Sequence, residues 1–173
     1  MALHCVVIRL SAITLSVIAC FTAPHAGASV DELALNGAFR ATSNGDWAQT
    51  NDSYHDELTV RSIWTITSAC STALECSGTV TSDQGWTAPI NKTSQSWTVE
   101  RQIANWEPCV GGTAGTGRQV YRFYAVDESG AYDPNSQPSS VYAGVDKTTG
   151  PSGACGINRI LAITMPFRLE KLG

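Results

Sequence analysis

The sequence predicts an all-β protein: an antiparallel meander that closes into a small β-barrel or, alternatively, a two-sheet β-sandwich. Apolar and polar residues alternate with a period of two through much of the chain, the pattern of half-buried antiparallel strands. Residues that favour turns separate these runs at short intervals. No long amphipathic helix is predicted to cover a sheet face, so the sheet must cover itself.

The first 28 residues have the features of a signal peptide. A segment with one positive charge precedes an apolar run over 10–21, and Ala26-Gly27-Ala28 supplies the small residues that a signal peptidase needs. We expect cleavage after Ala28, which leaves 29–173 as a single secreted domain. Alternatively, the residues up to Cys20 resemble a bacterial lipobox, in which this cysteine would be acylated. Both readings predict export.

The remaining chain contains one short helix signal and a series of strand signals. A helix of one or two turns is predicted over 29–35, where Ser29 and Glu32 form a capping box. The clearest strands are 58–67, 97–102, 119–127 and 161–169, and shorter candidates are 37–42, 46–50, 77–82, 86–90 and 141–146. Trp64 and Trp97 lie within this alternation and are expected in the core.

Turn signals separate the strands. Asn44-Gly45 predicts a type I′ hairpin, and Asp83-Gln84-Gly85 predicts a short turn. Longer loops are expected over 105–118, 128–140 and 147–158.

Length and charge exclude several classes of protein. A chain of 173 residues is of single-domain size. Its 11 basic and 15 acidic residues give a net charge of −4 with no basic stripe, which argues against a nucleic-acid partner. No apolar run reaches the length of a membrane-spanning helix, so no transmembrane segment is expected in the mature chain.

The cysteines indicate an oxidising compartment. Cys5 and Cys20 lie in the leader, and four remain. Their spacing fits no paired zinc knuckle, so we expect no metal site. Pairing of Cys70 with Cys76 across one loop leaves Cys109 for Cys155, whose loops lie at the same end of a meander.

No catalytic residue can be assigned. His55 is the single histidine of the mature chain, and no Gly-x-Ser-x-Gly motif is present. Paired carboxylates would suit a small carbohydrate-active hydrolase, which remains an alternative; the candidates are Asp52, Asp56, Glu57, Glu100 and Glu107. No cofactor is expected.

Three tryptophans beside turns are the candidate ligand-binding residues: Trp47, Trp86 and Trp106. We therefore expect a secreted or envelope-located, non-catalytic binding module. Its ligand would be an apolar small molecule or lipid inside the barrel, or a glycan at the tryptophan-bearing rim. The alternative is a structural or interaction protein that contacts envelope proteins through its loops.

Several segments resemble uncharacterised small secreted proteins of mycobacteria and related actinobacteria. They are 64–67, 82–86, 105–109, 146–156 and 165–169, spread over nearly all of the mature chain. The resemblance implies a location in the cell envelope or the culture fluid. It carries no catalytic residue, substrate or cofactor.

Overall fold

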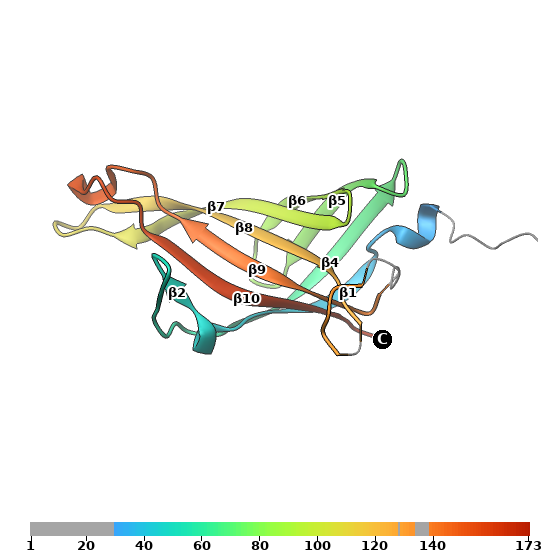
Figure 1. The fold of residues 1–173 in the computed structure, drawn as a ribbon. Helices are drawn as coiled ribbons and strands as arrows, with labels where there is room; N and C mark the ends of the chain where they lie inside the picture. Colours follow the sequence, from blue (N-terminus) through green and yellow to red (C-terminus); the bar gives the residue numbers. More distant parts are fainter. Residues whose placement is uncertain (1–29, 128, 134–138) are drawn as a thin grey trace, which may run out of the picture.

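The structure, a computed structural model, describes residues 30–127, 129–133 and 139–173. Eight antiparallel strands form a closed barrel, in which each strand pairs with the next along the chain and β10 pairs back with β1 (Figure 1). The strands are β1 (Gly37–Ser43), β4 (Val60–Cys70), β5 (Glu75–Ser82), β6 (Thr87–Thr93), β7 (Ser96–Pro108), β8 (Ala114–Ala125), β9 (Val141–Thr149) and β10 (Ala162–Lys171). A short pair, β2 (Gln49–Thr50) and β3 (Ser53–Tyr54), extends the sheet from β10. The predicted barrel is confirmed, and the sandwich is not formed.

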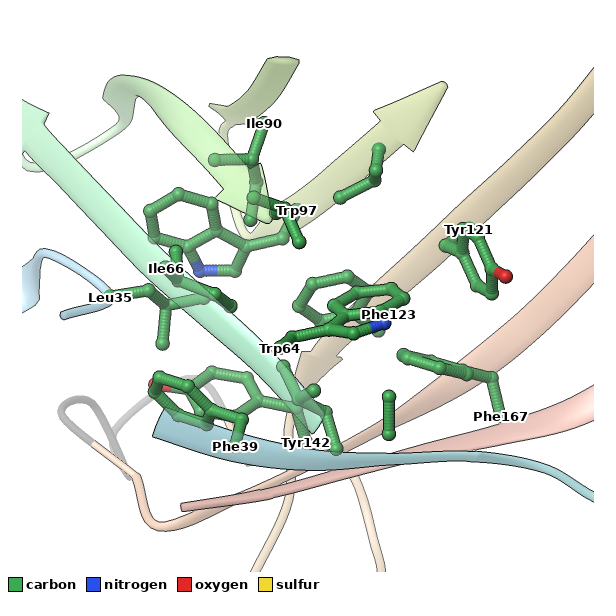
Figure 2. Packing of buried hydrophobic residues seen from close by; sticks show 14 of the residues in the cluster. Leu35, Phe39, Trp64, Ile66, Ile90, Trp97, Tyr121, Phe123, Tyr142 and Phe167 are labelled. Carbon is green, nitrogen blue, oxygen red and sulfur yellow. The ribbon is translucent and has the colours of Figure 1, made fainter. Parts of the chain in front are cut away.

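Strand alternation directs the large apolar side chains into the barrel. In β4 the odd and even positions are exposed and buried in turn, which places Trp64 and Ile66 inside at 1% exposure each. Trp97 on β7 is fully buried, and Phe123 on β8 lies opposite it in the ladder. Figure 2 shows these rings packed together with side chains from most of the strands. Trp64 and Trp97 are therefore core residues, as predicted.

One end of the barrel is closed by packing and by a disulfide. Cys70 and Cys76 are joined across the β4–β5 turn, and Leu35 is buried at the same end. The aliphatic part of the Lys92 side chain is buried, and its ammonium group donates a hydrogen bond to the carbonyl oxygen of Ala73 at 3.0 Å. Burial lowers the pKa of this lysine. Leu35, Cys76 and Lys92 are all buried at this end.

At the opposite end, two long connections project together. Cys109 in the β7–β8 turn is bonded to Cys155 in the 3-10 turn η3 (Ala154–Gly156), which lies between β9 and β10. Figure 1 shows the β7–β8 hairpin and the β9–β10 connection extending side by side beyond the barrel. Both predicted disulfides are confirmed.

Several local expectations were wrong. Asn44-Gly45 does not form a hairpin: Asn44 caps the 3-10 turn η2 (Gly45–Trp47) through a bond from the Asp46 backbone N–H. The predicted 105–118 loop is mostly strand, because the β7–β8 ladder continues past a bulge to Pro108 and Ala114. The predicted 147–158 loop begins only after Thr149, where β9 ends.

The predicted N-terminal helix is a 3-10 turn, η1 (Val30–Leu33). Its proposed cap Ser29, the leader and Cys20 lie outside the described residues. Within the described part of the chain, no helix is long and apolar enough to cross a membrane.

Candidate functional site at the barrel mouth

The open end of the barrel contains a cavity of about 300 Å³. It lies where β6 and β7 separate: their ladder runs only from Thr93–Ser96 to Ile90–Val99, although β7 continues to Pro108. Apolar, aromatic and polar side chains share the lining; they are Glu57, Leu58, Val60, Gln84, Arg101, Ile103, Trp106, Gln119, Tyr121, Thr148, Ile163 and Met165. We call this cavity the mouth.

A row of polar side chains runs from the mouth into the barrel wall. Arg101 Nε donates to Gln119 Oε1 at 2.7 Å. The amide nitrogen of Gln119 donates to both carboxylate oxygens of Asp146, at 2.9 and 3.0 Å. Ser43 Oγ donates to Asp146 Oδ2 at 2.7 Å. Gln119 therefore links an arginine that lines the cavity to a carboxyl group that is only 1% exposed.

Burial and hydrogen bonding act on the Asp146 carboxyl in opposite directions. Burial raises its pKa, because the charged form loses its water, and this is the larger effect. The hydrogen bonds from Ser43 and Gln119 and the charge of Arg101 lower the pKa, but the net direction is upward. Burial also raises the pKa of Tyr121, with a further contribution from Asp146, so its phenol stays protonated. The mouth thus presents the Arg101 cation, the Glu57 carboxylate and neutral hydrogen-bonding groups, and it lies beside a buried titratable carboxyl group.

Trp86 packs behind the lining of the mouth, against residues of β4, β7 and β8. It is half-buried, stacks on Tyr121 with ring centroids 6.4 Å apart, and meets the edge of Trp64 at 5.4 Å. The guanidinium of Arg101 lies 4.4 Å from the centre of the Trp86 ring, a cation–π contact. Trp86 therefore supports the mouth by holding Arg101 and Tyr121 in place.

The three tryptophans singled out from the sequence do not form one surface. Trp106 lines the mouth, where its ring rests on Gly117; a Cβ at this glycine would lie 2.7 Å from the ring. Trp86 reaches the mouth only through Arg101 and Tyr121. Trp47 is 69% exposed in η2 and does not line the cavity.

The candidate acids are dispersed. Within the described residues Glu57 is the only carboxylate that lines the mouth, and it contacts His55 Nδ1 at 3.2 Å. Asp56 accepts a bond from the Tyr54 hydroxyl, and Glu100 is paired with Arg118 on the outer surface. The Glu107 carboxylate packs against Gly150 beyond the barrel. Asp52 is exposed in the β2–β3 turn.

Sequence reasoning missed Gln119 and Asp146 as site residues. Gln119 lies on the same inward-facing side of β8 as Tyr121 and Phe123. Asp146 lies on the same inward-facing side of β9 as Tyr142. A polar residue in the apolar phase of a strand was the available signal, because such a side chain must find partners inside the barrel. Arg101, in phase with Trp97 and Val99, carried the same signal.

Comparison with known proteins gives a likeness of fold. No protein-family model matches the chain, and neither does any curated protein. Among solved structures, the monomer form of the PknI sensor domain of Mycobacterium tuberculosis is similar, with a TM-score of 0.54. The sequences are 12% identical over 80% of this chain and 88% of that one. At this identity the likeness shows that the fold is shared.

Proposed function

We propose that this protein is an exported, non-catalytic binding module that holds a small ligand at the mouth of its barrel. The observation that carries the proposal is the composition of the mouth, in which apolar and aromatic side chains surround a few convergent polar groups. Small-molecule sites are generally built in this way. The likeness to a sensor domain supports a binding role by analogy of fold alone.

The geometry favours a compact ligand with one polar or anionic group. Below the mouth, the ring of Phe167 packs against those of Trp64 and Phe123, and all three are buried in the barrel. A long lipid chain would have to displace these rings. Arg101 and Gln119 offer hydrogen bonds at the mouth, while Ile163 and Met165 offer an apolar surface. A glycan that stacks on Trp106 is the alternative ligand for the same opening.

Export rests on the N-terminal segment and the disulfides. We infer that residues 1–28 are a signal peptide cleaved after Ala28 and that 29–173 is the single secreted domain. The two disulfides support this, because such bonds persist in oxidising compartments. The resemblance to mycobacterial secreted proteins supports the cell envelope or the culture fluid as the location.

The test compares native and denaturing masses of protein purified from its own culture. The denaturing mass gives the N-terminus and any acyl group on Cys20. We expect the native mass to exceed it by a discrete adduct, and the size of the adduct to identify the ligand class. Equal masses would contradict the mouth site and favour the packed-barrel interaction protein.

A matched pair of variants locates the adduct. Ile103 lines the mouth, so Ile103→Trp should fill the cavity and abolish the adduct. Val110 is fully exposed in the β7–β8 turn, so Val110→Trp should retain it. An adduct that survives Ile103→Trp would show that the ligand binds elsewhere.

A further inference from the structure

The outer surface of β8 and β9 carries a cluster of cations. Arg118 and Arg122 are four residues apart on β8 and therefore point outward from the same face. In the ladder Arg118 pairs with Thr149, Val120 with Lys147, and Arg122 with Val145. Lys147 is therefore a diagonal neighbour of both arginines, at about 7–8 Å between backbones. All three basic side chains are exposed.

In the described part of the chain, Arg118 is the one cation of this cluster that has an ion-pair partner. Arg118 donates from Nε to Glu100 Oε1 at 2.6 Å and from a terminal nitrogen to Oε2, and this pairing raises the pKa of Arg118. Arg122 and Lys147 have no ion pair within the described residues. Adjacent like charges on a sheet surface repel each other. Among the described residues, no carboxylate forms an ion pair with either of these two cations.

The cations line shallow hollows on the outer surface. One hollow of about 420 Å³ is lined by Arg118, Arg122 and Lys147. A second hollow, of about 350 Å³, shares Arg118 and Thr149 with it and continues towards Thr116. A third, of about 370 Å³, is lined by Tyr124 at the far end of β8, by Tyr132 and by Gln95 and Ser96 at the β6–β7 turn, and it shares no lining residue with the first. We call this series of hollows the β8–β9 groove.

The length of the groove and its aromatic end suit an extended chain. The outward positions from Thr116 to Tyr124 span about 27 Å at about 3.4 Å per residue. Tyr124 and Tyr132 line the third hollow, where their rings form an edge-to-face pair with centroids 5.1 Å apart. Tyrosine rings present both an apolar face and a hydroxyl group, which suits contact with a sugar.

We propose that the β8–β9 groove binds an anionic polysaccharide chain. Acidic groups of successive sugars contact Arg122 and Lys147, Arg118 is held in place by Glu100, and a sugar ring packs against Tyr124 and Tyr132. This site is separate from the mouth: its lining residues point outward, whereas Gln119 and Tyr121, between them on β8, point inward. It therefore does not depend on the function proposed for the mouth.

The test titrates the full chain with linear oligogalacturonates, uronic-acid chains chosen as defined probes, by isothermal calorimetry at low salt. We expect a chain of about eight units to bind and galacturonate itself to bind at least tenfold more weakly. Arg122→Glu and Lys147→Glu should each weaken binding of the long chain by about tenfold or more, since each removes a charge-assisted contact. Raising the salt concentration should weaken binding as well.

Arg61→Glu is the matched control, because it makes the same change in net charge. Arg61 is exposed on β4, which lies four strands from β8 in either direction around the barrel. The affinity of the Arg61→Glu variant for the long oligogalacturonate should stay within twofold of that of the unsubstituted protein. Equal losses in Arg61→Glu and Arg122→Glu would overturn the proposal, because net charge alone would then explain the binding.

Three other results would also overturn the proposal. Galacturonate that binds as tightly as the long chain would indicate a simple anion site. Binding to phosphatidylglycerol vesicles without binding to the oligosaccharide would indicate a membrane surface, and tighter binding of double-stranded DNA would indicate a nucleic-acid site. Circular dichroism of each variant checks that the barrel is folded, and Arg122→Gln provides a second, milder test.

Discussion

Gln119 donates two hydrogen bonds to Asp146, one to each carboxylate oxygen, and thereby joins a buried acid to the mouth. Because the amide oxygen of Gln119 accepts from Arg101, the orientation of this side chain is fixed from both sides. A change in the charge of Asp146 therefore changes the preferred orientation of Gln119 and the environment of Arg101. The mouth and the buried acid form one connected polar unit.

The first prediction concerns stability and pH. Burial raises the pKa of Asp146 above its ordinary value of 3.8, so the folded protein holds this proton more tightly than the unfolded chain does. The resulting stabilisation is complete below the unfolded pKa and is lost as the pH rises through the folded value. In the unsubstituted protein, Asp146 should therefore make the free energy of unfolding fall as the pH rises above about 4. In the Asp146→Asn variant this fall should be smaller. Urea denaturation over a pH series measures this slope.

Asp127→Asn is the control, because the pKa of Asp127 is shifted in the opposite direction from that of Asp146. Asp127 is exposed, and hydrogen bonds from Ser129 and Ala131 lower its pKa. Its stabilising contribution is present above the unfolded pKa and is lost as the pH falls through the folded value, so this substitution should alter the acid side of the profile. If Asp146→Asn left the slope above pH 4 unchanged, the buried acid would not be coupled to folding.

The second prediction concerns the core. Ile90 is fully buried on β6 among the aromatic rings shown in Figure 2, so Ile90→Ala should cost about 2–5 kcal/mol of the free energy of unfolding. Ile157 is 58% exposed in the β9–β10 connection, and Ile157→Ala should change stability by less than about 0.5 kcal/mol. The urea midpoints of the two variants measure these changes in stability. Similar losses of stability in Ile90→Ala and Ile157→Ala would argue against the packed core.

The third prediction ranks the disulfides. Cys109 and Cys155 are 46 residues apart, whereas Cys70 and Cys76 are 6 apart. From loop entropy, replacing both cysteines of the longer bridge by alanine should cost about 4 kcal/mol, and the same change in the shorter bridge about 2 kcal/mol. Denaturation of the two double variants tests the order. The reverse order would mean that the closed end depends on its short bridge more than chain entropy predicts.

Strand alternation could be read from the sequence because it is a local property with a period of two. It placed Trp64 and Trp97 in the core and indicated an antiparallel meander, but it counted 46–50 as a full strand where the structure has the 3-10 turn η2 and the two-residue β2. The register between strands, in contrast, depends on residues far apart in the sequence. The alternation within a strand does not predict that Lys147 lies diagonal to Arg122, or that Gln119 and Asp146 form a hydrogen bond. Both candidate sites depend on such pairings, so the sequence indicated single members such as Trp106 but not the arrangement of either site.

The turn at Asn44-Gly45 shows how tertiary packing can override a local signal. The Asn44 side chain accepts bonds from the Asp46 backbone and from the Thr59 hydroxyl, which ties it to the chain leading into β4. A Cβ at Gly45 would lie 1.9 Å from the carbonyl oxygen of Glu57. Glycine is required here for a close approach between backbones, and not for the positive φ of a type I′ hairpin.

The last prediction uses the contact between Gly117 and Trp106. A Cβ at position 117 would lie 2.7 Å from the Trp106 ring and 2.9 Å from the Thr148 methyl group, so the ring must move in Gly117→Ala. We expect a changed near-ultraviolet circular dichroism spectrum, a loss of about 1–3 kcal/mol from overpacking, and weaker retention of the mouth adduct. Gly115→Ala is the matched control, because its nearest new contact is the Ala154 methyl group at 3.3 Å. If the Gly117→Ala variant showed the changed spectrum and still retained the adduct fully, Trp106 would not contribute to ligand binding. The ligand would then bind on the Arg101 side of the cavity.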